Sequence, residues 1–234
     1  NISGSDMVTN SASQSASNAI SASQSTGEQL NQTTSAIQNQ SNNLSHGLNK
    51  TSSYGDNSST SEAGNHRKSV ADLSSLVESY GKEFGRTKDE AWNDAIRMNA
   101  DAKMGVTVGT PGKGLFGSGA SAEASTGTSA SADESNSTRL SDSERVSRLQ
   151  SYQEQFSSNI DKVKSYSSGE QSSNTHAKSD SEMQSFVDSI NQSESLAKTQ
   201  HAQLTEAQSY TDLANSVKSG SISIGRDFNQ DFVN

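Results

Sequence analysis

Apolar residues recur every three or four positions along three long stretches of a chain that is otherwise rich in serine, asparagine and glutamine. Residues 6–50, 141–166 and 179–218 keep this spacing, which is the a/d pattern of helices that pack through one face. The positions of the first stretch are Ala16, Ile20, Ser23, Gly27, Leu30, Thr34, Ile37, Ser41, Leu44 and Leu48. Half of them are small or polar, so we expect this helix to be ordered only against a partner.

The two later stretches carry larger side chains at the same spacing. In the second stretch the positions are Val146, Leu149, Gln153, Phe156, Ile160 and Val163. In the third they are Met183, Phe186, Val187, Ile190, Ala197, His201, Leu204, Ala207, Tyr210, Ala214 and Val217. Each stretch starts with a serine followed three residues later by glutamate, the capping-box pattern of a helix N-terminus.

Between the first two stretches lies a denser region, Lys68 to Gly119, which holds the only tryptophan and the only proline. Its first part, 68–103, has helical spacing that we expect to break at Gly81 and Gly85 and to restart at a Thr87–Glu90 capping box. Its second part, 104–119, alternates apolar and polar residues around a Thr-Pro-Gly turn, which predicts a small β-hairpin. The residues 118–138 that follow form either a further strand or a flexible linker.

The predicted fold is mainly α: elongated antiparallel helical rods, a coiled-coil-like bundle, with a small glycine-rich β-hairpin or β-sheet head. We divide the chain into a helical arm and loop (1–67), a central helix with the glycine-rich β region (68–138), and helical rods with a tail (139–234). In the tail, Phe228 and Phe232 are spaced one helical turn apart, which suggests a docking segment.

Composition sets a competing expectation of disorder. Only 28% of the residues are hydrophobic, and Leu, Ile, Val and Phe together make up about 15% of the chain. The sustained helical spacing nevertheless favours ordered helices, because a chain that does not fold has no reason to place its few apolar residues so regularly.

The formal charge of −9 argues against a nucleic-acid partner, whose phosphates attract basic patches. The chain has no cysteine, which excludes disulfides and thiolate chemistry. A cytosolic and a periplasmic location are therefore equally allowed. Its longest apolar runs are two or three residues, so no segment is expected to span a bilayer. We expect the sequence to be a part excised from a larger protein.

No motif predicts an enzyme, a metal site or a cofactor. Glycines 112, 114 and 117 match the dinucleotide fingerprint in spacing, but no apolar helix follows them to receive a pyrophosphate. The histidines, at 46, 66, 176 and 201, lie too far apart for paired metal ligation. For His201 we expect a polar notch between helices.

Two stretches carry a resemblance to a known family. The first joins Trp92-Asn93-Asp94-Ala95 to Lys103-Met104-Gly105-Val106-Thr107-Val108-Gly109 and the glycine-rich segment 115–119, and the second is 226–233. With the Ser/Gln-rich helical flanks, they resemble the C-terminal soluble region of TraG-type conjugal transfer proteins of F-like type IV secretion systems.

The resemblance implies a non-enzymatic periplasmic domain of an inner-membrane-anchored protein, reaching the membrane only through a missing N-terminal part. Its roles in plasmid transfer would be mating-pair stabilisation and being the donor-side target of entry exclusion. The implied partners are an inner-membrane entry-exclusion protein of the recipient cell and other transfer-apparatus proteins, and self-association stays open. A structural filament or tape-measure-like helical protein is the main alternative, and a periplasmic hydrolase is a remote one.

The predicted recognition surface is the turn and the apolar pair after it: Thr110, Pro111, Gly112, Lys113, Leu115 and Phe116. A turn fixed by proline presents its side chains at low entropic cost, and Lys113 supplies a positive charge on an acidic molecule. Leu115 and Phe116 either anchor the partner or pack on the helix that carries Trp92.

Overall fold

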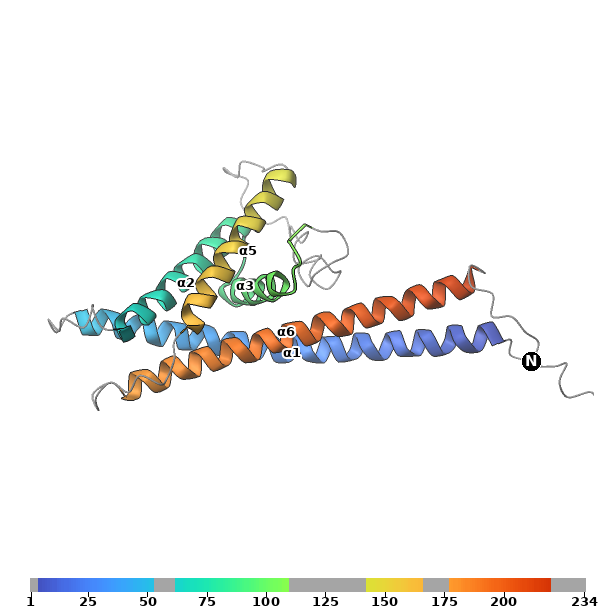
Figure 1. The fold of residues 1–234 in the computed structure, drawn as a ribbon, viewed down its shortest axis with the longest axis horizontal. Helices are drawn as coiled ribbons and strands as arrows, with labels where there is room; N and C mark the ends of the chain where they lie inside the picture. The colour runs from blue at the N-terminus through green and yellow to red at the C-terminus, as the bar shows by residue number, and fades with distance from the viewer. Residues whose placement is uncertain (1–3, 53–61, 110–141, 166–176, 220–234) are drawn as a thin grey trace, which may run out of the picture. The chain divides into compact units, whose positions relative to one another are not determined.

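The computed structural model describes residues 4–52, 62–109, 142–165 and 177–219, and these ranges are mainly helical, as predicted (Figure 1). Within them there is no strand. The helices are α1 (Gly4–Ser52), α2 (Glu62–Phe84), α3 (Lys88–Lys103), α5 (Asp142–Lys164) and α6 (Ala177–Lys218). The three long periodic stretches of the sequence correspond to α1, α5 and α6.

Contacts divide the chain into two compact units. The two-helix unit consists of residues 1–27 and 199–234, and the central unit consists of residues 28–198. Both boundaries fall inside a helix, one within α1 and the other within α6. Neither falls at residue 67 or 138, so the three-part division by sequence stays a prediction.

In the two-helix unit, the first half of α1 lies beside the last half of α6, with the N-terminus of α1 and the C-terminus of α6 at the same end (Figure 1). The pairing is therefore antiparallel. The buried apolar residues are small: Ala12, Ala16, Ala19, Ala207, Ala214 and Val217. Ile20, predicted to be on the buried face, is 43% exposed because the neighbouring Ala19 takes the buried place. That prediction was wrong.

Polar side chains complete the contact in this unit. The Thr26 hydroxyl donates to Gln203 Oε1 at 2.9 Å, and Gln200 Nε2 donates to the Ser23 carbonyl oxygen at 3.1 Å. Gly27 is buried against Gln200. Because these polar groups bond to each other across the two helices, the seam tolerates polar residues at core positions.

The core of the central unit forms where α2, α3 and α5 pack against one another. The aromatic rings of Tyr80 and Phe84 from α2 meet those of Tyr152 and Phe156 from α5 edge to face, with ring centroids 5.3 to 5.9 Å apart. Edge-to-face packing at such distances is the favoured geometry for aromatic pairs. The helix α5 therefore packs mainly on α2 and α3, whereas the sequence predicted that residues 141–166 would pack antiparallel along the other two long helices.

The rest of the central unit joins α3 to the second half of α1 and the first half of α6. Trp92 on α3 meets Phe186 on α6 edge to face, with 6.3 Å between ring centroids. The α1 residues Leu30 and Ile37 are fully buried, and the hydroxyl of Ser193 donates to that of Thr33 at 2.8 Å. The buried face predicted for 30–44 is confirmed.

The turn between α2 and α3 follows its sequence signals with one exception. Gly85 takes a φ of +63°, a conformation that favours glycine, and follows the end of α2. The Thr87–Glu90 capping box at the start of α3 is confirmed. Gly81, predicted as a break, lies within α2, where a Cβ would sit only 3.1 Å from the Arg86 carbonyl oxygen.

The predicted β-hairpin is not seen in the part of 104–119 that the structure describes. Residues 104–109 form two turns and contain no strand. Residues 110–119 lie outside the described ranges, as do 118–138. Val108 is buried and Val106 is half-buried, whereas Thr107 between them is exposed, so the alternation reflects a segment that lies against the helices without being a strand.

Candidate interaction site

The candidate site is the segment Met104–Gly109, which leads from the end of α3 to the predicted recognition turn. Met104 caps α3, and its N–H donates to the carbonyl oxygen of Ala100 at 3.1 Å. The N–H of Val106 then donates to the Asp101 carbonyl oxygen at 2.9 Å. Gly105 has a φ of +73°, a backbone conformation that is strained for residues with a side chain, so glycine suits the turn at this position. The chain thereby turns back from the end of α3 toward α5.

Gln153 of α5 holds this segment by its backbone. The side chain of Gln153 is 4% exposed, and its Oε1 accepts from the Val108 N–H at 3.0 Å. Its Nε2 donates to the carbonyl oxygens of Val106 at 2.9 Å and Met98 at 3.1 Å. One buried amide thus satisfies three backbone groups, two of them in the turn segment and one on α3.

A second glutamine and a valine complete the attachment. Gln150, one turn before Gln153, donates from Nε2 to the Val108 carbonyl oxygen at 3.0 Å. At Gly109 the φ is +91°, and a Cβ there would lie 2.7 Å from Val146 Cγ1, so only glycine fits. The position and direction of the backbone at Gly109, directly before the predicted turn, are fixed by α5.

An open groove borders the segment on its α5 side. It measures about 530 Å³ and is lined by Ala102, Gly105, Val106, Thr107, Gln150, Gln153, Glu154, Ser157, Ser158 and Asp161. Lys103 Nζ and Asp161 Oδ2 form an ion pair of 2.5 Å there, but both side chains are substantially exposed. Exposed pairs contribute about 0–1 kcal/mol, so the glutamine bonds hold the segment more than this charge pair does.

The six predicted recognition residues, Thr110, Pro111, Gly112, Lys113, Leu115 and Phe116, lie outside the described residues. The structure describes only the segment Met104–Gly109 that directly precedes them. Gln153 was placed on the buried face by its spacing, but its bonds to the segment were not foreseen. Gln150 was missed, and its only signal was its place one turn before Gln153.

No protein-family model, curated protein or solved structure matches the chain. The resemblance described above therefore rests on its own residues, of which Trp92–Ala95 and Lys103–Gly109 lie in the described part.

A buried ionic cluster lies on the other side of α3. Asp94 Oδ2 accepts from the Tyr80 hydroxyl at 2.9 Å and pairs with Arg86 Nε at 3.1 Å. Burial raises the pKa of Asp94, and burial followed by the charge of Asp94 raises the pKa of Tyr80. Burial also lowers the pKa of the neighbouring Arg97 guanidinium.

This cluster fastens α2, the turn after it and α3 to one another. A tyrosine with a raised pKa that donates to a carboxylate is held in its neutral form, which is the opposite of an activated nucleophile. Arg86, Asp94 and Arg97 of this cluster line a recess of about 360 Å³ together with Asn31 and Thr34 of α1. Its chemistry is that of a buried structural contact.

Among the described residues, no three His, Cys, Asp or Glu side chains gather closely enough to bind a metal ion. None of the described helices is both long enough and apolar enough to cross a bilayer. His201 lies half-buried on α6 in the two-helix unit.

Proposed function

We propose that this chain is a non-enzymatic interaction domain of a conjugative transfer protein, acting in mating-pair stabilisation and as the donor-side target of entry exclusion. The residues that resemble TraG-type proteins support the family. The attachment of Val106–Gly109 to α5 supports the mode of action, and it is the observation that carries the proposal.

The reason is preorganisation. A recognition segment that starts from a fixed backbone loses less conformational entropy on binding than one that starts from a free end. Gln153 and Gln150 hold Val108, and Gly109 fits against Val146, directly before Thr110. The partner, an inner-membrane entry-exclusion protein of the recipient, would then bind a segment whose first backbone position, after Gly109, is already fixed by α5.

The glycine-rich β head belongs to this proposal. Residues 104–109 form no strand, so a hairpin turning at Thr110-Pro111-Gly112 would lack its first arm, and any β-structure of the head would have to be formed by residues after the turn. Lys113 would orient the encounter, and Leu115 with Phe116 would be the apolar anchor. A periplasmic position, as part of an inner-membrane-anchored protein, follows from the same resemblance.

The test exchanges Pro111, Gly112 and Lys113 together for alanine, asparagine and glutamine in the full transfer protein. We expect unchanged circular dichroism of the domain and weaker exclusion, seen as more frequent transfer into recipients that carry the exclusion protein. A matched control replaces Ser13 and Gln14, which are exposed on α1, with alanine and should leave exclusion as it was. Normal folding with unchanged exclusion in the turn variant would place recognition elsewhere.

A further inference from the structure

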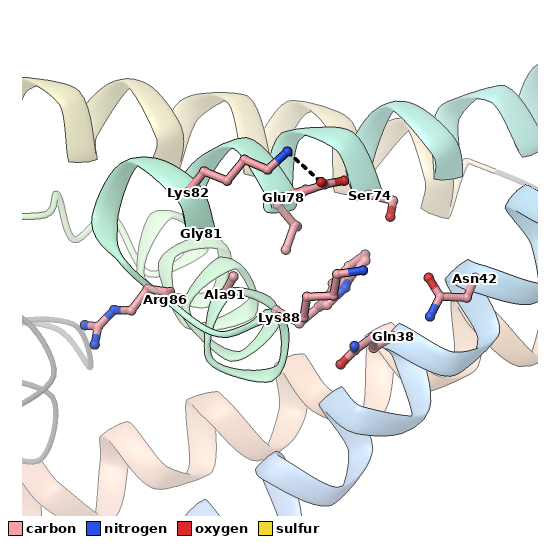
Figure 2. Close-up of a pocket in the computed structure, with 11 residues that line it drawn as sticks. Gln38, Asn42, Ser74, Glu78, Gly81, Lys82, Arg86, Lys88 and Ala91 are labelled. Atoms are coloured by element: carbon pink, nitrogen blue, oxygen red, sulfur yellow. Dashed lines mark ion pairs between the residues drawn. The ribbon is translucent and has the colours of Figure 1, made fainter. Parts of the chain in front are cut away.

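A pocket of about 180 Å³ lies among α1, α2 and the start of α3 in the central unit (Figure 2). Its lining includes the apolar side chains of Val77, Ala91 and Trp92, each at most 3% exposed. An apolar cavity of about 150 Å³ is large enough to bind benzene. The pocket therefore has the size and the lining for one phenyl ring, with Trp92 available for edge-to-face contact.

The rim of this pocket is basic. Lys82 Nζ forms an ion pair of 2.7 Å with Glu78 Oε1. Figure 2 shows Arg86 directed away from the pocket, whereas Lys88 extends from the start of α3 toward Gln38 and Asn42 on α1. Glu78 lies within reach of the charges of both Lys82 and Lys88 and can offset only one of them, so one positive charge stays available beside the apolar lining, where Lys88 is placed to bind an anion. The ligand that fits is an aromatic ring next to a carboxylate.

The chain itself contains this ligand chemistry twice. Asp227-Phe228 and Asp231-Phe232 are the only places where aspartate directly precedes phenylalanine, and they are four residues apart. The described phenylalanines, at 84, 156 and 186, already pack in the central unit. Each Asp-Phe pair combines one negative charge with one aromatic ring. Because the chain carries an overall charge of −9, a pocket with a basic rim and an apolar lining attracts such a pair where most of the acidic surface would repel it.

We propose that this pocket binds an Asp-Phe pair from residues 227–232 of a second copy of the chain. The ring enters against Trp92 and Val77, and the aspartate carboxylate meets Lys88. Either pair can occupy the pocket, which raises the chance of rebinding without any new contact. This inference is independent of the proposed function, because it concerns another surface and a partner of the same sequence.

Light scattering of the full chain over a range of concentrations tests the self-association. We expect the mass of the wild type to rise above the 24.7 kDa of one copy as concentration increases. Two variants should stay at that mass, the double variant Phe228→Ala/Phe232→Ala and the single variant Lys88→Glu. Lys88 is the first residue of α3, where a negative charge favours the helix dipole, so Lys88→Glu should keep its helical circular dichroism.

The single tryptophan gives a direct view of the pocket, because Trp92 lines it and a peptide of residues 223–234 contains no tryptophan. Added to the Phe228→Ala/Phe232→Ala chain, this peptide should shift Trp92 emission in a saturable way. Lys88→Glu in that chain should weaken binding by roughly tenfold or more. A peptide with Asp227→Lys and Asp231→Lys should recover binding to the Lys88→Glu chain.

Several results would overturn the proposal. One is a wild type whose mass stays at that of one copy at every concentration. This result would overturn the proposal even if Phe228→Ala/Phe232→Ala changed Trp92 emission, because the tail would then not join two copies. Another is association that persists unchanged in both variants, which would place the interface elsewhere. A peptide that leaves Trp92 emission unchanged, or that binds the Lys88→Glu chain as tightly as the parent, would exclude this pocket.

Discussion

The central unit and the two-helix unit are built from the same serine-rich sequence but fill their cores differently. All of the largest fully buried side chains belong to the central unit, among them Tyr80, Phe156 and Phe186. In the two-helix unit alanine and glycine occupy the seam, while the exposed large apolar residues of the described chain are Met7, Ile20 and Leu213. Helical spacing alone therefore does not show how much apolar area a helix pair buries.

The difference follows from the number of neighbours that each helix has. In the central unit α3 packs against α2 and α5 and also contacts α1 and α6, so a large side chain can be surrounded. Two helices alone cannot enclose a large ring, and a seam of alanines lets their backbones approach closely. We expect large substitution effects in the central unit and small ones in the two-helix unit.

The largest expected effect is that of Phe156→Ala. Phe156 is fully buried between the rings of Tyr80 and Tyr152, so its loss removes apolar area and leaves a cavity. We expect the free energy of unfolding to fall by about 3–4 kcal/mol. Urea unfolding followed by the fluorescence of Trp92 measures it, because Trp92 reports on the central unit.

The matched change in the two-helix unit is Val217→Ala. Val217 is buried, but it loses only two methyl groups, so we expect about 1 kcal/mol, seen in the helical circular dichroism. Equal losses in the two variants would contradict the contrast between the units.

Gln153→Leu comes next. Leucine has a similar volume but leaves the Val108 N–H and the carbonyl oxygens of Val106 and Met98 without their partner. We expect a loss of about 2 kcal/mol and faster hydrogen exchange at the Val108 amide. The control is Gln155→Leu on the same helix, because the Gln155 side chain is exposed and, among the described residues, bonds only to Ser151. Equal exchange rates in both variants would show that Gln153 does not hold the segment.

Gln153 also shows which properties of a residue could be predicted from the sequence and which could not. Its place in the three-and-four spacing put it on the buried face of α5, and the structure confirms this. Its partners are backbone groups 45 to 55 residues earlier in the chain. No periodicity identifies such a contact, because any glutamine can bond to any free backbone group.

The incorrect predictions have similar causes. Alternation of Val106 and Val108 suggested a strand, yet two apolar residues after a helix end are equally compatible with a segment held by side chains. Ile20 was placed on the buried face by its four-three spacing from Ala16 and Ser23, but the smaller neighbour Ala19 takes the buried place in the two-helix seam. Spacing also defined the buried face of α5, but the shared spacing suggested that the other two long helices would cover it, whereas α2 and α3 do. Local signals such as the Thr87–Glu90 box were confirmed because they depend on neighbouring residues only.

A smaller effect is expected from Thr87→Ala. Thr87 Oγ1 accepts from the Glu90 N–H at 3.3 Å, which satisfies one free donor at the start of α3. Removing such a cap destabilises a helix by about 1 kcal/mol. The Trp92 transition should shift to lower urea by a corresponding amount. Thr87→Ser, which keeps the hydroxyl, should restore most of the stability, and a loss as large as that of alanine would argue against the cap.

Glu90→Gln should have a smaller effect that depends on pH. The Thr87 N–H donates to the Glu90 carboxylate at 2.8 Å, and this bond holds the pKa of Glu90 below its usual value. Such a carboxylate contributes stability above its unfolded pKa of about 4.3 and loses it as pH falls through the lower folded pKa. Glu90→Gln should therefore melt below the wild type at neutral pH, and the difference should shrink in acid. A difference that grows in acid would contradict this sign.

The smallest expected effect is that of Gly27→Ala in the two-helix unit. A Cβ at Gly27 would lie 2.6 Å from Gln200 Nε2, the atom that donates to the Ser23 carbonyl oxygen, so the glutamine must move. Losing that bond costs about 1 kcal/mol, and replacing a helical glycine with alanine gains about the same. We expect the melting temperature to change little. With Gln200→Ala already present, Gly27→Ala should instead stabilise the chain by about 1 kcal/mol, because no side chain has to give way. Identical effects of Gly27→Ala in the two backgrounds would show that Gln200 does not pack against Gly27 in the two-helix unit.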